Sequence, residues 1–135
     1  MPDIEKILSE NNNVLAIICK TNEITGKSNF ITPNDFGFQI VVQNSNEGQY
    51  WKPHRHLPFE NLSYLSAQEF IYVIKGKIEI GIYSEYDKKV ADRILNVGDS
   101  GILNSGHDIK SLEHNTKFLA IKQGPYREGE KILIK

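Results

Sequence analysis

The residues best suited to chemistry in this chain are two histidines and a glutamate. His54 and His56 are separated by one residue, and Glu69 opens the next strongly apolar run. If Tyr50 to His56 forms a β-strand, both imidazoles point to one face, because side chains alternate along a strand. Two imidazole nitrogens and a carboxylate oxygen can then reach one metal ion at about 2.0–2.2 Å. The spacing predicts a metal site on a sheet, although a surface strand with two solvated histidines gives the same pattern.

Other features of the chain favour the metal site. The sequence has only four histidines, so two of them on one strand face is a concentrated use. The run from Glu69 to Tyr83 (EFIYVIKGKIEIGIY) is the most strand-like in the chain, and it begins with a carboxylate where an apolar residue is the default. A third histidine, His107, follows Gly106 in a turn and is a further candidate ligand.

The elements that must position these residues are short strands separated by turn signals. The expected strands are Val14 to Lys20, Phe36 to Gln43, Tyr50 to His56, Glu69 to Tyr83, Val90 to Leu95, Ile109 to Leu112 and Lys117 to Lys122. Gly76 and Gly81 indicate bends or bulges within the longest run. Asp3 to Glu10 is expected to be a short helix, which Asp3 caps. This pattern predicts an all-β sandwich or barrel.

The order of these residues resembles the cupin superfamily. Its first motif is G-x5-H-x-H-x3–4-E-x6-G, and Gly48, His54, His56, Glu69 and Gly76 match it, except that twelve residues precede the glutamate. Its second motif is G-x5-P-x-G-x2-H-x3-N. Here Gly98 begins that motif, Asn104 replaces the proline, His107 directly follows Gly106 and Ser111 stands at the asparagine position. The chain is most similar to small single-domain cupins that end in Lys-Gln-Gly-Pro-Tyr, which is Lys122 to Tyr126 here.

The resemblance implies a jelly-roll β-barrel with a metal ion inside. Residues 36–126 would form the barrel and residues 1–13 a helix and lead-in, all within one domain spanning 1–135. By the same resemblance, His54, His56, Glu69 and His107 would bind one divalent ion. Three imidazoles and a carboxylate suit Fe, Mn, Ni, Co or Zn, and they disfavour Ca and Mg.

Such an ion usually keeps one or two positions open, so the expected function is that of a metal-dependent enzyme. Its substrate would be a small polar metabolite, such as a sugar derivative or keto acid, and its reaction an isomerisation, epimerisation, lysis or dioxygenation. Tyr50 and Lys52 share the strand face of His54 and His56 and are the candidate catalytic pair. The alternatives are that both are rim residues without chemistry, that the protein binds a ligand without turnover, or that the metal is only structural.

One further segment and two single residues could act near the metal. Leu57 to Gln68, the insertion in the first motif, carries apolar residues and is expected to be a lid or a dimer contact. Gln68 could orient a ligand, although a residue next to Glu69 on a strand normally faces away from it. Lys122 is in step with Phe118 and Ala120, which would turn it inward, although an outward lysine is the commoner outcome.

Composition sets the remaining expectations. Sixteen basic and seventeen acidic residues leave the chain nearly neutral, so we expect no nucleic-acid partner. The single cysteine, Cys19, excludes an internal disulfide and lies in an apolar run, where it is expected to be buried. The chain shows no signal peptide and no membrane span, which favours a soluble cytoplasmic protein. Exposed strand edges in a small barrel favour a homodimer.

Overall fold

The structure of the chain is a computed structural model, and it describes residues 2–57, 67–123, 128–129 and 131–134. The described residues are built almost wholly from antiparallel strands and irregular segments, with one short 3₁₀ turn at Thr21–Glu23. The strands are β1 Ile4–Leu8, β2 Val14–Lys20, β3 Ser28–Phe30, β4 Val41–Gln43, β5 Glu69–Lys75, β6 Lys77–Tyr83, β7 Lys89–Asn96, β8 Asp99–Leu103, β9 His107–Ser111 and β10 Lys117–Lys122.

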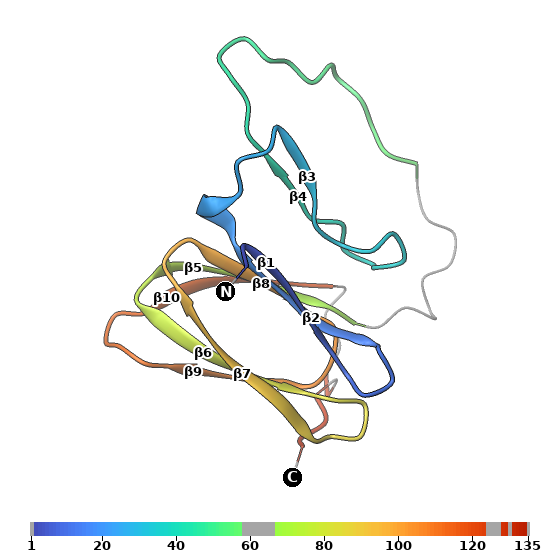
Figure 1. Cartoon of the computed structure of the whole chain (residues 1–135), viewed down its shortest axis with the longest axis vertical. Helices are drawn as coiled ribbons and strands as arrows, with labels where there is room; N and C mark the ends of the chain where they lie inside the picture. The colour runs from blue at the N-terminus through green and yellow to red at the C-terminus, as the bar shows by residue number, and fades with distance from the viewer. Residues whose placement is uncertain (1, 58–66, 124–127, 130, 135) are drawn as a thin grey trace.

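These strands form three sheets. The largest has five strands in the order β1-β2-β8-β5-β10, and a second has three in the order β7-β6-β9. The two face each other across the middle of the molecule, as Figure 1 shows. The third sheet, the hairpin β3-β4, lies on the other side of the five-stranded sheet. Every strand pair is antiparallel.

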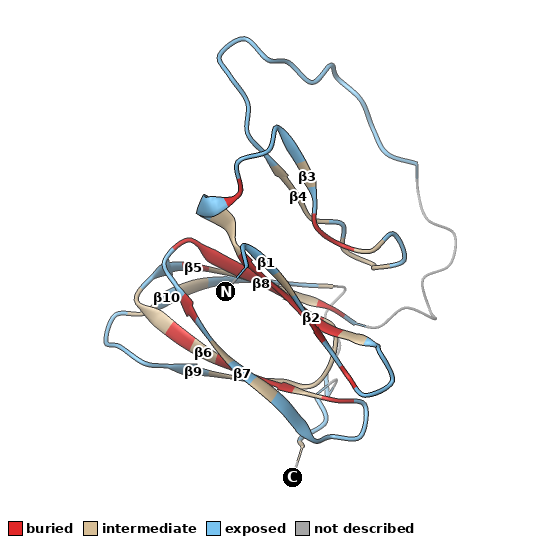
Figure 2. Cartoon of the chain, viewed as in Figure 1, coloured by how far each residue is buried: buried red, intermediate tan, exposed pale blue. Residues whose placement is uncertain are grey.

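The main core fills the space between the two larger sheets. Alternate residues of β5 and β6 supply much of it, including Ile71, Val73 and Ile80, which are fully buried. Figure 2 shows that buried residues are frequent along the strands of these two sheets. This pattern follows from the period of two in the sequence of these strands, which puts every second side chain on the inner face.

A second, smaller core lies under the β3-β4 hairpin. Ile17 and Ile102 point out of the other face of the five-stranded sheet and pack with residues of the segment between β2 and β4, such as Ile31. Cys19 belongs to this cluster and is buried, as predicted. Burial raises the pKa of its thiol to about 11, which leaves it protonated and inert at neutral pH.

The predicted N-terminal helix is wrong. Residues Ile4–Leu8 form β1, which pairs with β2 and places Ile7 in the core. A tight turn joins the two strands: Asn12 has a φ of 63°, and the hydroxyl of Ser9 accepts hydrogen bonds from two backbone N–H groups of the turn. A short isolated helix is marginal in water, so pairing with the β-branched strand β2 outweighs the local helical spacing.

The all-β prediction is confirmed, but the structure shows no closed barrel. In the described residues, no backbone hydrogen bonds pair a strand of one of the two larger sheets with a strand of the other. Side chains connect one pair of their edges: the guanidinium of Arg93 on β7 donates to both carboxylate oxygens of Glu5 on β1, at 3.0 and 3.1 Å. The described part of the chain contains no helix long and apolar enough to cross a membrane.

Candidate functional site

Glu69 and His107 enter the space between the two larger sheets from opposite sides. Glu69 is the first residue of β5 and lies on the face that carries the buried Ile71 and Val73. His107 is the first residue of β9 and lies on the face of Ile109, which packs against the same core. Because side chains alternate along a strand, both residues point inward. The fold therefore brings together two of the four predicted metal ligands.

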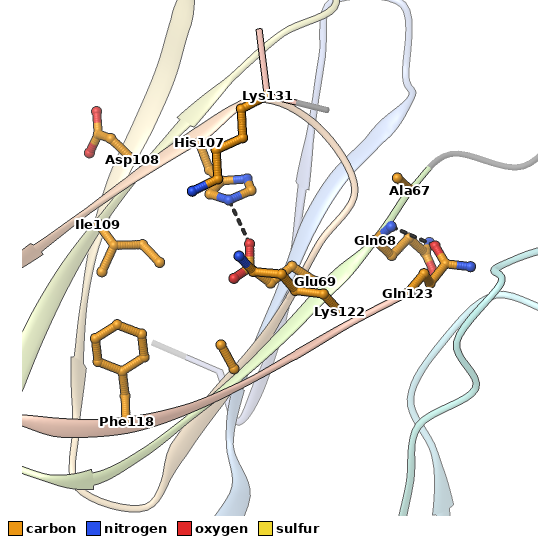
Figure 3. A pocket seen from close by; sticks show the side chains of 12 residues that line it. Ala67, Gln68, Glu69, His107, Asp108, Ile109, Phe118, Lys122, Gln123 and Lys131 are labelled. Atoms are coloured by element: carbon orange, nitrogen blue, oxygen red, sulfur yellow. Dashed lines mark hydrogen bonds and ion pairs between the residues drawn. The ribbon is translucent and has the colours of Figure 1, made fainter. Parts of the chain in front are cut away.

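The two side chains are in direct contact. Nε2 of His107 lies 2.9 Å from Oε2 of Glu69, and Nδ1 lies 2.9 Å from the carbonyl oxygen of Ser105 (Figure 3). Both neighbours of the ring accept hydrogen bonds, so both ring nitrogens donate, which is the protonated state of histidine. The His107 side chain is 28% exposed and the Glu69 side chain 15% exposed. The pair is a partly buried ion pair.

The pKa values of both groups move in the direction that favours this ion pair. The hydrogen bond from His107 lowers the pKa of Glu69 below its ordinary value, and burial partly opposes this effect. The hydrogen bond to Glu69 is the main cause that raises the pKa of His107, again against the effect of burial. The positive charges of Lys122 and Lys131 contribute to the lowered pKa of Glu69.

The pair lies in the wall of a cavity of about 510 Å³. Lys122 lines this cavity from β10, where it stands directly opposite Glu69 in the strand register. Phe118 on the same strand supplies an apolar wall, and Lys131 reaches the cavity from the C-terminal segment (Figure 3). Of the two orientations considered for Lys122, the structure therefore shows the inward one. The sequence pattern did not predict Lys131 as a residue of the site.

Gln68 does not act on Glu69 but anchors the start of β5. Its side chain is buried, accepts a hydrogen bond from the backbone N–H of Phe38 at 2.8 Å, and donates to the side-chain oxygen of Asn104 at 2.9 Å. Its backbone N–H donates to the side-chain oxygen of Gln123 at 2.6 Å. Asn104, which takes the place of the motif proline, donates in turn to the carbonyl of Val14. These hydrogen bonds fix the backbone at the start of β5, where Glu69 points inward.

The structure does not bring His54 and His56 to this pair. The predicted strand from Tyr50 to His56 is wrong: residues 44–57 are irregular and exposed, and they form an arm that extends away from the sheets (Figure 1). Pro53 explains the difference, because proline lacks the backbone N–H that a paired strand needs. The two imidazole rings are nevertheless neighbours, with centroids 5.2 Å apart.

Tyr50 and Lys52, the candidate catalytic pair, lie on the same exposed arm. The Tyr50 side chain is 73% exposed, and neither residue lines the cavity of Glu69 and His107. The predicted lid, Leu57 to Gln68, lies mostly outside the described residues, since residues 58–66 are not among them. Of that segment, Ala67 and Gln68 border the cavity and Leu57 is exposed.

The donor atoms of Glu69 and His107 suit two neighbouring positions on one metal ion. Two ligands at about 2.1 Å and at right angles around an ion are about 3.0 Å apart, close to the observed 2.9 Å. The bond from Nδ1 of His107 to the Ser105 carbonyl would fix the ring with Nε2 free to ligate, which is the usual support of a metal-bound histidine. Nδ1 of His54 has the same kind of partner, the Lys52 carbonyl at 2.7 Å. Among the described residues, no group of three or more candidate ligands is gathered in one place.

Comparisons of the chain with protein-family models, with curated proteins and with solved structures gave no match.

Proposed function

We propose that the chain is a cupin-like, metal-dependent protein that acts on a small polar metabolite in the cavity of Glu69 and His107. The observation that supports this most is the approach of these two residues, from opposite sheets, to 2.9 Å inside the cavity. A carboxylate and an imidazole with shifted pKa values in a cavity are typical of a functional site. The reaction classes that fit are isomerisation, epimerisation, lysis or, with ferrous iron, dioxygenation.

In this proposal Glu69 and His107 hold one divalent transition-metal ion, and His54 and His56 complete its ligands. The ion, when bound, would act as a Lewis acid on a carbonyl or hydroxyl of the metabolite. Thirteen residues from His56 to Glu69 can span up to about 45 Å when extended, so chain length allows the arm to reach the cavity. The jelly-roll barrel belongs to the same proposal, and it is supported by the two facing sheets around one core.

A binding module without turnover is the second candidate, and the position of the arm favours it. Tyr50 and Lys52 were the best candidates for an acid or base beside the metal, and both lie away from the cavity. If the ion occupies Glu69 and His107, neither of these is free to move a proton. Lys122 is then the titratable side chain of the β10 wall that faces the ligand.

One experiment separates the two candidates. Protein loaded with Fe²⁺, Mn²⁺, Ni²⁺, Co²⁺ or Zn²⁺ is incubated in D₂O with small 2-oxo acids and keto sugars, and proton NMR follows hydrogen exchange next to the carbonyl. Exchange that requires the metal and disappears in Glu69→Gln supports isomerase or lyase chemistry. Ligand-induced thermal stabilisation without exchange or product supports the binding module. The absence of exchange, product and stabilisation together would contradict both.

We also propose that two copies associate through the outer face of β5 and β10. Five side chains of this face, Phe70, Tyr72, Ile74, Leu119 and Ile121, are apolar or aromatic, and the last three are each almost half exposed, while Lys117 adds one exposed charge at the start of β10. The β3-β4 hairpin covers the β2-β8 part of the same face, and β10 is an edge strand. An edge strand whose outward side chains are mostly apolar pairs readily with a second copy.

A further inference from the structure

Charged side chains of both signs line the cavity. Two carboxylates, Glu69 and Asp108, and two lysines, Lys122 and Lys131, contribute to its lining. Asp108 has partners on the outer side of β9: its Oδ2 accepts a hydrogen bond from the Tyr83 hydroxyl at 2.6 Å, and it lies 3.9 Å from the Lys89 ammonium. Glu69 is engaged by His107.

The two lysines have no such partner within the described part of the chain. None of the salt bridges found there includes Lys122 or Lys131. Lys122 is fixed beside Glu69 by the register of β10 against β5, and Figure 3 shows that both lysines reach towards the Glu69–His107 pair from different segments. With Asp108 paired to Lys89, the positive charges of Lys122 and Lys131 exceed the negative charge of Glu69 by one, and a protonated His107 adds to this excess. A divalent ion at Glu69 and His107 would increase this excess.

The other end of the cavity is apolar. Phe118 and Ile109 lie on the inward faces of β10 and β9 and border the same cavity. A ligand that fits both ends of the cavity has an anionic group at one end and uncharged carbon atoms at the other. A volume of about 510 Å³ is in the range of sites for small metabolites.

We propose that the ligand of this cavity is a small organic acid whose carboxylate lies between Lys122 and Lys131, with its next polar atom turned towards Glu69 and His107. This inference rests on the proposed function, because it gives the charge class of the metabolite in the same cavity. Lys122 is then a specificity-determining residue, because its charge attracts a carboxylate more strongly than the hydroxyl groups of a neutral sugar. A carboxylate held by two ammonium groups makes hydrogen bonds in which donor and acceptor are both charged, whereas the acceptor of the corresponding amide is neutral.

Calorimetric titration of metal-free protein with malonate, and with malonamide as the neutral probe of similar shape, tests the inference. We expect malonate to bind at least tenfold more tightly than malonamide. Lys122→Met should weaken malonate binding at least tenfold, and Lys122→Arg should keep most of it. Lys110→Met is the matched control, because Lys110 lies on the outward face of β9, and it should leave binding unchanged.

Three results would overturn the inference: no malonate binding, equal binding of malonamide, or equal weakening by Lys110→Met and Lys122→Met. Because these titrations contain no metal, they stand apart from the test of the metal site. Metal binding without malonate binding would leave the proposed function in place and remove the organic acid. Malonate binding by a protein that never binds a metal ion would keep the organic acid and contradict the metal-dependent function.

Discussion

Replacing Glu69 by glutamine should destabilise the metal-free protein in a pH-dependent way. The substitution keeps the shape of the side chain but removes the charge that holds the His107 imidazolium at 2.9 Å. Hydrogen bonds to charged groups contribute about 1.5–3 kcal/mol, and partial exposure reduces this, so we expect a loss of about 1–2 kcal/mol. For a domain of this size the loss corresponds to a fall in Tm of roughly 3–8 °C.

The two shifted pKa values set the pH range of this effect. The lowered pKa of Glu69 makes its contribution present above the ordinary value of 4.5 and lost as pH falls through the folded value. The raised pKa of His107 makes its contribution present below the ordinary value of 6.5 and lost as pH rises through the folded value. The difference in unfolding free energy between wild type and Glu69→Gln should therefore be largest between about pH 4.5 and 6.5.

Chemical denaturation at pH 5.5 and pH 9, with chelator present, measures this difference. Glu79→Gln is the control: it removes a carboxylate that faces away from the core on β6, opposite Lys110. NMR titration should also show that the pKa of His107 falls in Glu69→Gln. The reasoning is refuted if wild type and Glu69→Gln differ equally at both pH values, or if Glu79→Gln has the same effect at pH 5.5.

Three further predictions concern the frame around the site. Gly76→Ala should cost more stability in denaturant unfolding than Gly48→Ala, because both glycines have positive φ but only the added Cβ at Gly76 meets backbone, the Thr116 Cα at 2.8 Å; equal costs would contradict the contact. Ile80→Ala, in the fully buried core, should lower the free energy of unfolding by about 2–5 kcal/mol. Ile74→Ala should lower that of the monomer much less, and equal losses in the two variants would contradict the assignment of the core. Ile121→Glu should shift a dimer to a monomer in light scattering, and a variant that elutes and scatters like wild type would remove β10 from the interface.

The strands of the core were predictable because their sequence pattern and their packing agree. Val14 to Lys20 and Lys117 to Lys122 were expected as strands and are β2 and β10 with the same bounds. The run from Glu69 to Tyr83 was expected to bend or bulge at Gly76 and Gly81. It divides at Gly76, where φ is 82°, into β5 and β6, whereas β6 continues through Gly81. In these segments the period of two is strong, and burial of one face enforces it.

In the segments that differ from the prediction, the local sequence pattern and the pairing of the strands disagree. Residues 4–8 have helical spacing, but a strand partner, β2, follows after a tight turn, and pairing outweighs the spacing. Phe36 to Gln43 was expected as one strand, and only Val41–Gln43 pairs with β3, because the preceding residues bend to cover the small core. In the histidine segment Pro53 was the signal against a strand, and the H-x-H pattern outweighed it in the prediction.

For the candidate site, the sequence predicted the positions of Glu69 and His107 better than those of His54 and His56. Each of these residues begins a strand whose inward face is apolar, so strand parity alone sends them to the same interior. The sequence could not place Lys131, which reaches the cavity from an irregular segment without periodicity. The prediction that His54 and His56 join them stays a prediction.

The metal content of untagged protein tests that prediction most directly. Protein reloaded with each of Fe²⁺, Mn²⁺, Ni²⁺, Co²⁺ and Zn²⁺ is dialysed and measured by elemental mass spectrometry. The test compares wild type with Glu69→Gln, His107→Gln and the double variant of His54 and His56 to glutamine. His114→Gln is the control, because His114 lies in an exposed turn. The four-ligand site predicts about one ion per chain in wild type and control and a clear loss in the other three proteins. Wild type that retains no ion, or retention that survives all three changes, would contradict it.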